Sequence, residues 1–444
     1  TDDQRKALSC VALFEPLGKD DSVKDEYEYV THHRYIHRIL EPDQEIVDIL
    51  FHDTLQDYER RQLVEHNGMC IRIRPVLLAE WLSEEWIQLN GDELANVIQN
   101  IQAEDTNLST RLLASMSKRF KGLRESPYAQ SVVDKIAATG FFQEERIAFT
   151  NAGSQLFLSM GQVSPAAVAS NMYALLQKKS ISWLKNEMDY RVRRNWVWAL
   201  TNIVVDADAF PDAARAMLLL AIAESEHYAN NATGQFKQLF HIMLSGTMAP
   251  YEPRVALLEE MYEKGVDRHL IMDAIRNAYT IQGVHLDMND GIKDEEGNLR
   301  EYQPETYGDI HRYWMSCKDL LEKMATEDDA YRKEIREWLP KCLRDMCEQR
   351  SWVVYEKILE SFYREGEDWM EMYKGVTHYL EYGLIAPDLR AKLKEWQQKL
   401  EPKDFCNRLN QIQIDAFSDR KRSFEERWKY EAELVRPMVR EFID

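Results

Sequence analysis

The stretch Gln62-Leu-Val-Glu-His66, Asn67-Gly68, Met69-Cys-Ile-Arg-Ile-Arg74 decides the fold of the first ninety residues. It places an Asn-Gly pair between two short runs that favour β-structure. Both residues of such a turn tolerate positive φ, so this pair is the strongest short-range signal for a β-hairpin. Pro75 follows the second run and ends the predicted strand.

Helices are predicted on both sides of this hairpin. Apolar positions recur at helical spacing in the segments Gln4–Phe14, Asp25–Ile39, Pro42–Asp57 and Val76–Leu89. Three helices, a hairpin and a further helix are typical of a winged-helix domain. We therefore predict a winged-helix-like domain over residues 1–95. The alternative is an incidental hairpin on a helical domain.

The charge of this region argues against a DNA-binding winged helix. Residues 1–75 carry ten Lys and Arg against sixteen Asp and Glu, a net charge near −6. The whole chain of 444 residues has a formal net charge of −20. Acidic surfaces repel phosphate backbones, so we do not expect a nucleic acid partner. A winged helix that serves as a packing element fits the charge better.

From about residue 107 onward the pattern is helix after helix. Prolines open four apolar-periodic stretches at Ser126-Pro127, Ser164-Pro165, Phe210-Pro211 and Glu252-Pro253. In the first two pairs the serine is predicted to cap the helix. The prolines recur at about the spacing of two-helix repeats. We therefore predict a mainly α protein whose helices form an irregular HEAT-, armadillo- or TPR-like α-solenoid. An ordinary helical bundle is the alternative.

The predicted solenoid divides into a helical-repeat domain over residues 96–303 and a C-terminal helical domain over residues 304–444. The run Met217-Leu-Leu-Leu-Ala-Ile-Ala223 is apolar almost all round and is expected at the centre of the first. A small β-hairpin insertion is predicted over Leu286–Tyr302, where Asp290-Gly291 and Glu296-Gly297 mark turns.

Bulk composition indicates a cytoplasmic protein. No run of about 18 apolar residues occurs, so no membrane contact is expected. The six cysteines form neither a CxxC pair nor the framework of a secreted domain, and we interpret them as reduced thiols. The first residue is Thr1 and not Met, so we expect the chain to be trimmed or part of a longer protein.

Motifs of catalysis are missing from the sequence. It contains no GxxxxGK[ST], GxGxxG, GxSxG or HExxH. The residues Asp287, Asn289 and Asp290 suggest a calcium loop, but their spacing fails the EF-hand pattern, and a solvated turn is expected. We therefore predict no catalytic residue and no cofactor within the chain. An enzyme with an unrecognised site built from scattered residues such as Arg194, His241 and Asp309 is a remaining alternative.

Two segments are candidates for binding a partner. Arg191, Arg193 and Arg194 form the tightest basic cluster, just before Trp196 and Trp198, and could grip carboxylates or phosphates. Their alternative role is to pair with the surplus of acidic residues within the chain.

The second segment joins two strongly apolar helices, predicted over Met217–Ala229 and Phe236–Leu244. It contains Asn230, Asn231 and Gln235, with Thr233 as a predicted helix N-cap. A structural role at the helix ends and contact with a ligand are both open.

Two histidines four residues apart, His33 and His37, would share one face of a helix, as a metal site requires. Arg34 stands where a zincin has glutamate, and no third ligand is near. We therefore expect no metal, and a polar helix face accounts for these residues together with His32.

Several blocks of this sequence together resemble one family. They are Ile71-Arg-Ile-Arg-Pro75, Leu77-Leu-Ala-Glu-Trp-Leu82, Asn151-Ala-Gly-Ser-Gln-Leu-Phe157, Val163-Ser-Pro165, Arg193-Arg194 with Val197-Trp198-Ala-Leu200, Asn230-Asn-Ala-Thr-Gly-Gln-Phe236, Leu244-Ser-Gly-Thr247 and Pro304-Glu-Thr-Tyr-Gly308. In this order they resemble the region downstream of the nucleotide-binding domain in bacterial STAND-type P-loop NTPases of antiviral defence. The resemblance covers residues 1–325.

This resemblance implies a winged helix followed by a helical-repeat sensor that recognises a foreign protein, such as a phage protein. Recognition would release an upstream ATPase domain for oligomerisation and turn on an effector. ATP and Mg²⁺ would bind only through that upstream domain, which this chain lacks. In some members a winged-helix histidine contacts the nucleotide phosphate, a role that His33 or His37 would take here. A constitutive α-solenoid scaffold that binds protein without switching is the main rival hypothesis.

Overall fold

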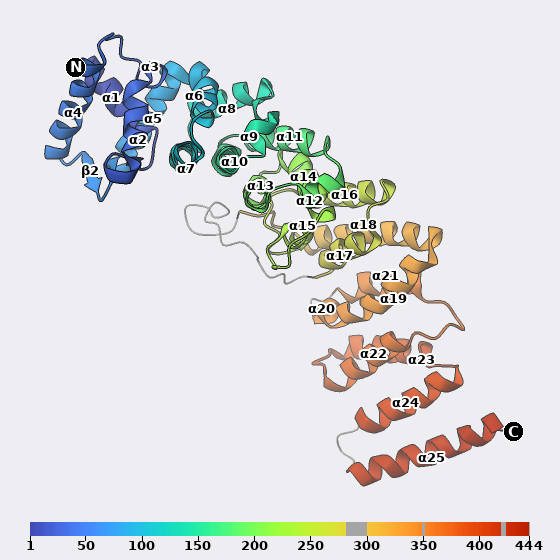
Figure 1. The fold of residues 1–444 in the computed structure, drawn as a ribbon. Helices are drawn as coiled ribbons and strands as arrows, with labels where there is room; N and C mark the ends of the chain where they lie inside the picture. The colour runs from blue at the N-terminus through green and yellow to red at the C-terminus, as the bar shows by residue number, and fades with distance from the viewer. Residues whose placement is uncertain (281–299, 349–350, 419–422, 444) are drawn as a thin grey trace. The chain divides into compact units, whose positions relative to one another are not determined.

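The computed structural model describes residues 1–280, 300–348, 351–418 and 423–443. The chain is mainly α-helical, as the sequence predicts, and three short strands are the β-structure of the described residues (Figure 1). The predicted hairpin insertion over 286–302 lies outside the described residues except for its last three. The calcium-like loop of Asp287, Asn289 and Asp290 also lies outside them.

Helices and a hairpin build the N-terminal segment in the predicted order. The hairpin consists of β2 (Val64–Asn67) and β3 (Cys70–Ile73), which pair antiparallel. Gly68 in the turn has φ of 60°, a conformation that glycine adopts without strain. The helices of this segment are α1 (Asp2–Ala12), α2 (Lys24–His32), α3 (Arg34–His37), α4 (Gln44–Arg60) and α5 (Val76–Asn90).

Two features of this segment differ from the prediction. A two-residue strand, β1 (Leu17–Gly18), pairs antiparallel with β3, so the sheet has the order β1-β3-β2. The helix predicted over Asp25–Ile39 is wrong as a single element, because His33 has extended backbone angles and separates α2 from α3.

A two-layered array of helices follows the N-terminal segment (Figure 1). In one layer α10 packs between α7 and α13, and in the other α11 packs against α8 and α14. The indole of Trp196 is fully buried beside Phe149 and Phe157, and its N–H donates to the carbonyl of Ala148 at 2.9 Å. The helices are α6 (Leu94–Gln102), α7 (Thr106–Gly122), α8 (Pro127–Ala138), α9 (Glu145–Ala148), α10 (Asn151–Val163), α11 (Pro165–Leu176), α12 (Ile181–Asn186), α13 (Tyr190–Ile203), α14 (Phe210–Ile222) and α15 (Ala232–Gln238).

The helix starts predicted at the four prolines are present, but the cap predicted at Ser164 is wrong. The hydroxyl of Ser126 accepts from the N–H of Ala129 and caps α8. Ser164 makes no such bond at α11: its backbone angles, φ −135° and ψ 81°, lie outside the extended region that Ser126 adopts, and its hydroxyl donates to the carboxylate of Asp134. The predicted central position of the run 217–223 is confirmed, since α14 buries Met217 and most of its neighbours. That helix ends at Ile222 and not at Ala229.

The chain divides into two compact units. Of the described residues, the first unit holds 1–239, 244–257 and 300–302, and the second holds 240–243, 258–280 and 303 onward. Helix α16 (Tyr251–Glu263) contributes residues to both. Residues 1–95 thus share a unit with most of the predicted helical-repeat segment 96–303, and the second unit contains the predicted segment 304–444.

The second unit is also built from helices. Its core contains Trp314, whose indole N–H donates to the carbonyl of Ala278 at 2.8 Å, and Tyr279, whose hydroxyl donates to the carbonyl of Trp314. The helices are α17 (Arg268–Ala278), α18 (Tyr307–Glu327), α19 (Asp329–Trp338), α20 (Leu343–Glu348), α21 (Trp352–Phe362), α22 (Met370–Tyr382), α23 (Pro387–Lys399), α24 (Phe405–Ser418) and α25 (Phe424–Ile443).

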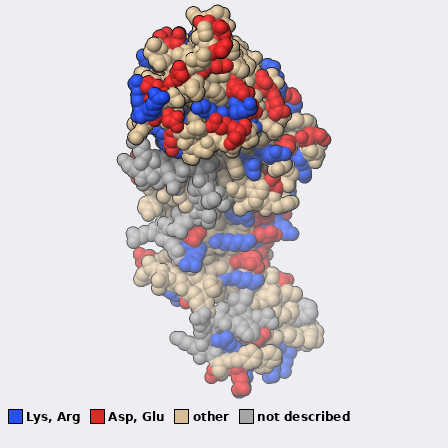
Figure 2. Space-filling model, turned by 60° about the vertical axis from the view of Figure 1, so that its left-hand side comes forward, with Lys and Arg blue, Asp and Glu red and all other residues tan. Residues whose placement is uncertain are grey.

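Neither sign of charge dominates the face of the molecule that Figure 2 shows, where acidic and basic side chains are intermingled. Among the described helices, none combines the length and the apolar character that crossing a bilayer requires.

Candidate functional site

The three arginines of the predicted basic cluster lie on α13, but they do not lie together on one surface. Arg193 is buried and donates to the carbonyls of Leu220 and Ala223 at 3.2 and 3.1 Å, and also to that of Leu184. These carbonyls belong to the C-terminal ends of α14 and α12, where the helix supplies no N–H donor for its last carbonyl groups. Arg193 therefore joins three helices and is not available to a partner.

Arg191 and Arg194 lie on the opposite, exposed face of α13. The guanidinium of Arg194 stacks over the ring of Trp198 at 5.0 Å, and that of Arg191 lies 5.5 Å from the ring of Tyr190. Trp198 is 37% exposed and Tyr190 is 60% exposed. Such cation–π contacts hold a guanidinium in place while its N–H donors stay free for carboxylates.

The polar segment before α15 is a structural joint between helices. The side chain of Asn231 accepts from the N–H of Gly234 and donates to the carbonyl of Glu226, so Asn231 is the N-cap. The predicted cap at Thr233 is wrong, because Thr233 lies inside α15 and its N–H bonds the carboxylate of Glu224. Gln235 is buried, and Asn230 is half-buried.

The two histidines do not share a helix face, because His33 lies between α2 and α3. The ring of His33 stacks on Tyr29 at 3.8 Å, and its Nδ1 lies 2.6 Å from the carbonyl of Tyr29. His37 is buried, and its Nδ1 accepts from the N–H of Ile39 at 3.0 Å. Burial lowers the pKa of His37 to about 4, and the charge of Arg34 adds to the effect. His37 is thus neutral at pH 7.

A cavity of about 170 Å³ lies beside His37. Arg38, at the C-terminal end of α3, and Ser9 of α1 also line it. Since Nδ1 of His37 is an acceptor, its other nitrogen carries the proton and is a hydrogen-bond donor. Nowhere in the part of the chain that the structure describes do three His, Cys, Asp or Glu side chains gather as a metal site would need.

The three residues of the enzyme hypothesis are divided between the two compact units. Arg194 belongs to the first unit, whereas His241 and Asp309 belong to the second. The carboxylate of Asp309 closes a capping box at the start of α18 by accepting from the N–H of Thr306 at 2.7 Å. These bonds lower the pKa of Asp309. A helix-capping role therefore accounts for Asp309.

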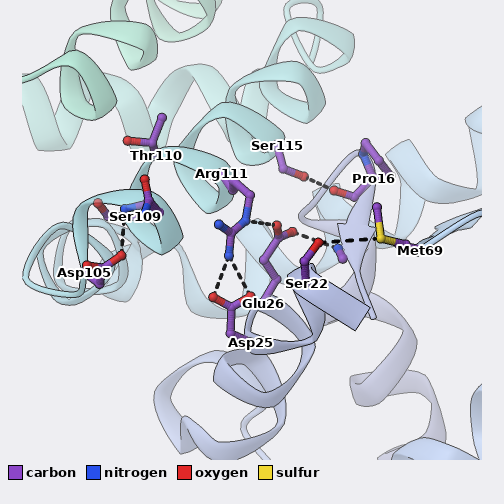
Figure 3. Close-up of polar contacts among 12 residues, drawn as sticks. Pro16, Ser22, Asp25, Glu26, Met69, Asp105, Ser109, Thr110, Arg111 and Ser115 are labelled. Carbon is purple, nitrogen blue, oxygen red and sulfur yellow. Dashed lines mark hydrogen bonds and ion pairs between the residues drawn. The ribbon is translucent and has the colours of Figure 1, made fainter. Parts of the chain in front are cut away.

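An ion cluster joins the N-terminal segment to α7, the second helix of the array, and we name this cluster with its neighbouring contacts the junction (Figure 3). Arg111 of α7 donates through Nε to Glu26 at 2.7 Å and through Nη2 to Asp25, both on α2. Glu26 is buried, and its other oxygen accepts from the N–H of Gly18 in β1 at 2.8 Å. One guanidinium thus ties α7 to α2 and, through Glu26, to the small sheet.

Two further residues of α7 complete the junction. Ser115 donates through its hydroxyl to the carbonyl of Pro16, and its own carbonyl accepts from the N–H of Glu15 (Figure 3). Arg119 is buried; it donates to the carbonyl of Ala12 at 2.8 Å and pairs with the carboxylate of Glu15. The loop after α1 is therefore held to α7 by hydrogen bonds and charge as well as by apolar packing.

Sequence analysis missed the junction. Arg111 and Arg119 lie 85 to 107 positions from their partners, and no motif links such residues. One signal was present: α7 contains Arg111, Lys118, Arg119 and Lys121 but no acidic residue, although the chain has 76 Asp and Glu. An arginine at an otherwise apolar helix position, as Arg119 is, indicates a buried partner.

Comparisons with known proteins gave no match: no family model, curated protein or solved structure resembles this chain significantly.

Proposed function

We propose that this chain is the regulatory and ligand-sensing region of a STAND-type P-loop NTPase. In this proposal the helical repeats recognise a foreign protein, such as a phage protein, and binding releases an upstream ATPase domain for oligomerisation. The proposal extends the sequence resemblance stated above. The order of the N-terminal elements supports it, since helix, short strand, helices and a hairpin in the sheet order β1-β3-β2 fit a winged helix.

The junction is the observation that carries the proposal. A sensor must pass a binding event on one element to another, which requires contacts that differ between two states. The cluster of Arg111, Asp25 and Glu26 joins the N-terminal segment to α7, and its Arg111–Asp25 pair is partly exposed to solvent. That exposed pair can exchange for water at modest cost, whereas the buried Glu26 needs a new partner when the junction opens.

His37 and His33 are proposed to sense the nucleotide of the upstream domain. His37 opens onto the cavity that Arg38 lines, and its neutral ring would offer an N–H donor and no charge to a phosphate. ATP and Mg²⁺ would be held by the upstream domain. The two histidines of this chain would only respond to which nucleotide is bound to that domain.

The rival function is a constitutive protein-binding scaffold, and one observation favours it. Arg119 is 2% exposed, and opening the junction around it would separate a buried charge from its partners. A scaffold would keep this junction closed at all times. It would also bind its partner equally well with or without an upstream nucleotide domain.

Limited proteolysis separates the two functions. Glu104 is exposed in the loop between α6 and α7, so the protease Glu-C, which cleaves after glutamate, reports whether this loop is accessible. We expect Arg111→Ala to speed cleavage after Glu104 several-fold, and Lys121→Ala on the same helix to leave it unchanged. A phage protein that copurifies with the chain should speed cleavage in the unmodified chain. If no candidate phage protein binds with micromolar affinity, the sensor function is wrong.

A further inference from the structure

Three neighbouring helices, α7, α10 and α13, contain no acidic residue at all. They form one layer of the array, with α10 in the middle. Four Lys and Arg lie on α7 and three on α13, in a chain whose formal net charge is −20. The charge of this layer is therefore opposite to that of the whole protein.

Some of these basic residues make contacts within the folded chain. Arg111 and Arg119 are paired in the junction, and Arg193 is buried against helix ends. Lys118, Lys121, Arg191 and Arg194 are exposed, and none of these four forms an ion pair with any residue that the structure describes. We name the surface that they make with Trp198 of α13 and Gln155 of α10 the basic face.

The carboxylates next to the basic face are already engaged. Glu224 accepts from the backbone N–H groups of Ser225, Glu226 and Thr233. Glu226 bonds the hydroxyl of Tyr228, whose pKa burial and this bond raise to about 12. Asp189 caps α13 through the N–H of Arg191 at 2.8 Å. Among residues 1–280 and the later described ranges, no carboxylate is thus paired with the arginines of the face, and their donors can meet an acidic partner.

The geometry points to an acidic, extended polypeptide segment of a partner protein as the occupant of the basic face. Helices in a layer lie about 10 Å apart, so crossing from α7 to α13 covers about 20 Å. An extended chain spans that distance with about six residues. Carboxylates at its two ends would meet the cations of α7 and α13. The amide of Gln155, midway, would bond its backbone.

A nucleic acid fits this face less well. Proteins that bind nucleic acids commonly make six to ten phosphate contacts, whereas the basic face offers four cations in two separate pairs. The net charge of −20 also repels a polyanion over long range, and it does so more strongly than it repels a short acidic peptide. This inference deepens the proposed function and rests on it for the protein nature of the partner.

Binding of a defined peptide tests the inference. The probe is a fluorescein-labelled (Glu-Ala)₆ peptide, titrated with the full 444-residue chain at about 50 mM salt and followed by fluorescence anisotropy. We expect saturable binding that weakens as salt is raised. The double variant Arg191→Glu/Arg194→Glu should bind at least tenfold more weakly. Trp198→Ala keeps the charge but removes the ring that holds Arg194 in place, and should weaken peptide binding about threefold.

A matched double variant controls for net charge. Lys185 on α12 and Lys394 on α23 are exposed cations that do not belong to the basic face. The variant Lys185→Glu/Lys394→Glu therefore changes the net charge by the same amount. It should change affinity less than twofold. An equal loss in this control, or no binding of the peptide, would overturn the inference. A twelve-nucleotide single-stranded DNA that binds more tightly through the same arginines would also overturn it.

Failure of the proposed function would look different. If the peptide binds through Arg191 and Arg194 but no partner speeds cleavage after Glu104, the basic face is correctly assigned and the switch is wrong. If cleavage responds to a partner that ignores the arginine variants, the switch is correct and the basic face is wrong.

Discussion

Buried arginines join elements that lie far apart in the sequence. Arg193 and Arg119 both donate to backbone carbonyls, and Arg193 does so at the ends of helices. A guanidinium suits this task because its five N–H donors form a fixed fork and its charge is delocalised. Burial lowers the pKa of both side chains, although neither approaches neutrality at pH 7.

Arg119 is predicted to contribute more to stability than its neighbour Lys118. Arg119→Ala leaves the carbonyl of Ala12 and the carboxylate of Glu15 without their donor, which should cost about 3 kcal/mol. Lys118→Ala removes an exposed side chain and should change the free energy of unfolding by less than about 0.5 kcal/mol. Urea unfolding of the two variants gives both values. Equal effects would mean that Arg119 is not a structural link.

His37 is predicted to make stability depend on pH. Its pKa is about 4 in the folded chain and 6.5 when unfolded, so the unfolded state binds more protons between these values. Titration of His37 therefore does not change the free energy of unfolding above pH 6.5. It lowers the free energy of unfolding as pH falls from 6.5 towards 4. In His37→Asn, the side-chain oxygen can accept from the N–H of Ile39. In this variant, unfolding should take up as much as one proton fewer between pH 4 and 6.5. Its free energy of unfolding should therefore fall less between pH 7 and pH 4.5 than that of the unmodified chain, as measured by urea unfolding at both values. His32→Gln, at an exposed position, should keep it.

At the scale of elements, the same substitution is predicted to have opposite effects in two helices. In α15 a Cβ on Gly234 would lie 1.9 Å from the carbonyl oxygen of Ala229, so Gly234→Ala forces the helix start to move and should destabilise by about 2 kcal/mol. In α22 a Cβ on Gly375 would meet its nearest atom at 3.6 Å, an ordinary contact. Gly375→Ala should therefore stabilise by about 0.5 to 1 kcal/mol through helix propensity. Thermal unfolding of both variants measures these effects. Unfolding temperatures that shift in the same direction in both variants would contradict the packing argument.

Local signals predicted elements well, but they did not fix every cap and boundary. Asn67-Gly68 and Ser126-Pro127 act on their nearest neighbours, so the hairpin turn and the start of α8 are visible in the sequence. Ser164 carries the same signal as Ser126, but its backbone does not adopt the extended conformation of a capping residue. The break at His33 has no local signature, since neither glycine nor proline is there.

The candidate sites follow the same rule. Sequence clustering placed Arg191, Arg193 and Arg194 in one site, yet helical periodicity turns Arg193 inward and leaves the other two outside. The contacts of Arg111 depend on how α2 is placed against α7, which no local pattern encodes. The charge bias of α7, α10 and α13 was readable in the sequence once their adjacency was known.

At the scale of the whole molecule, the chain combines two compact units, each with its own buried aromatic core. A chain of 444 residues exceeds the size at which a single hydrophobic core usually suffices. Helix α16 contributes residues to both units. Variants of one buried tryptophan in each unit can show whether the two units unfold separately.

Trp196 in the first unit and Trp314 in the second are matched in burial and bonding. Both are fully buried, and both donate an indole N–H to a backbone carbonyl, at 2.9 and 2.8 Å. We predict two transitions in scanning calorimetry, because units with separate cores usually unfold as separate cooperative blocks. Trp196→Ala and Trp314→Ala should each cost about 3 to 5 kcal/mol. Each should lower the transition of its own unit and leave the other within about 2 °C. If both transitions move together in either variant, the two units are coupled in unfolding. The chain would then behave as one cooperative body, as a signal that travels along the whole array would require.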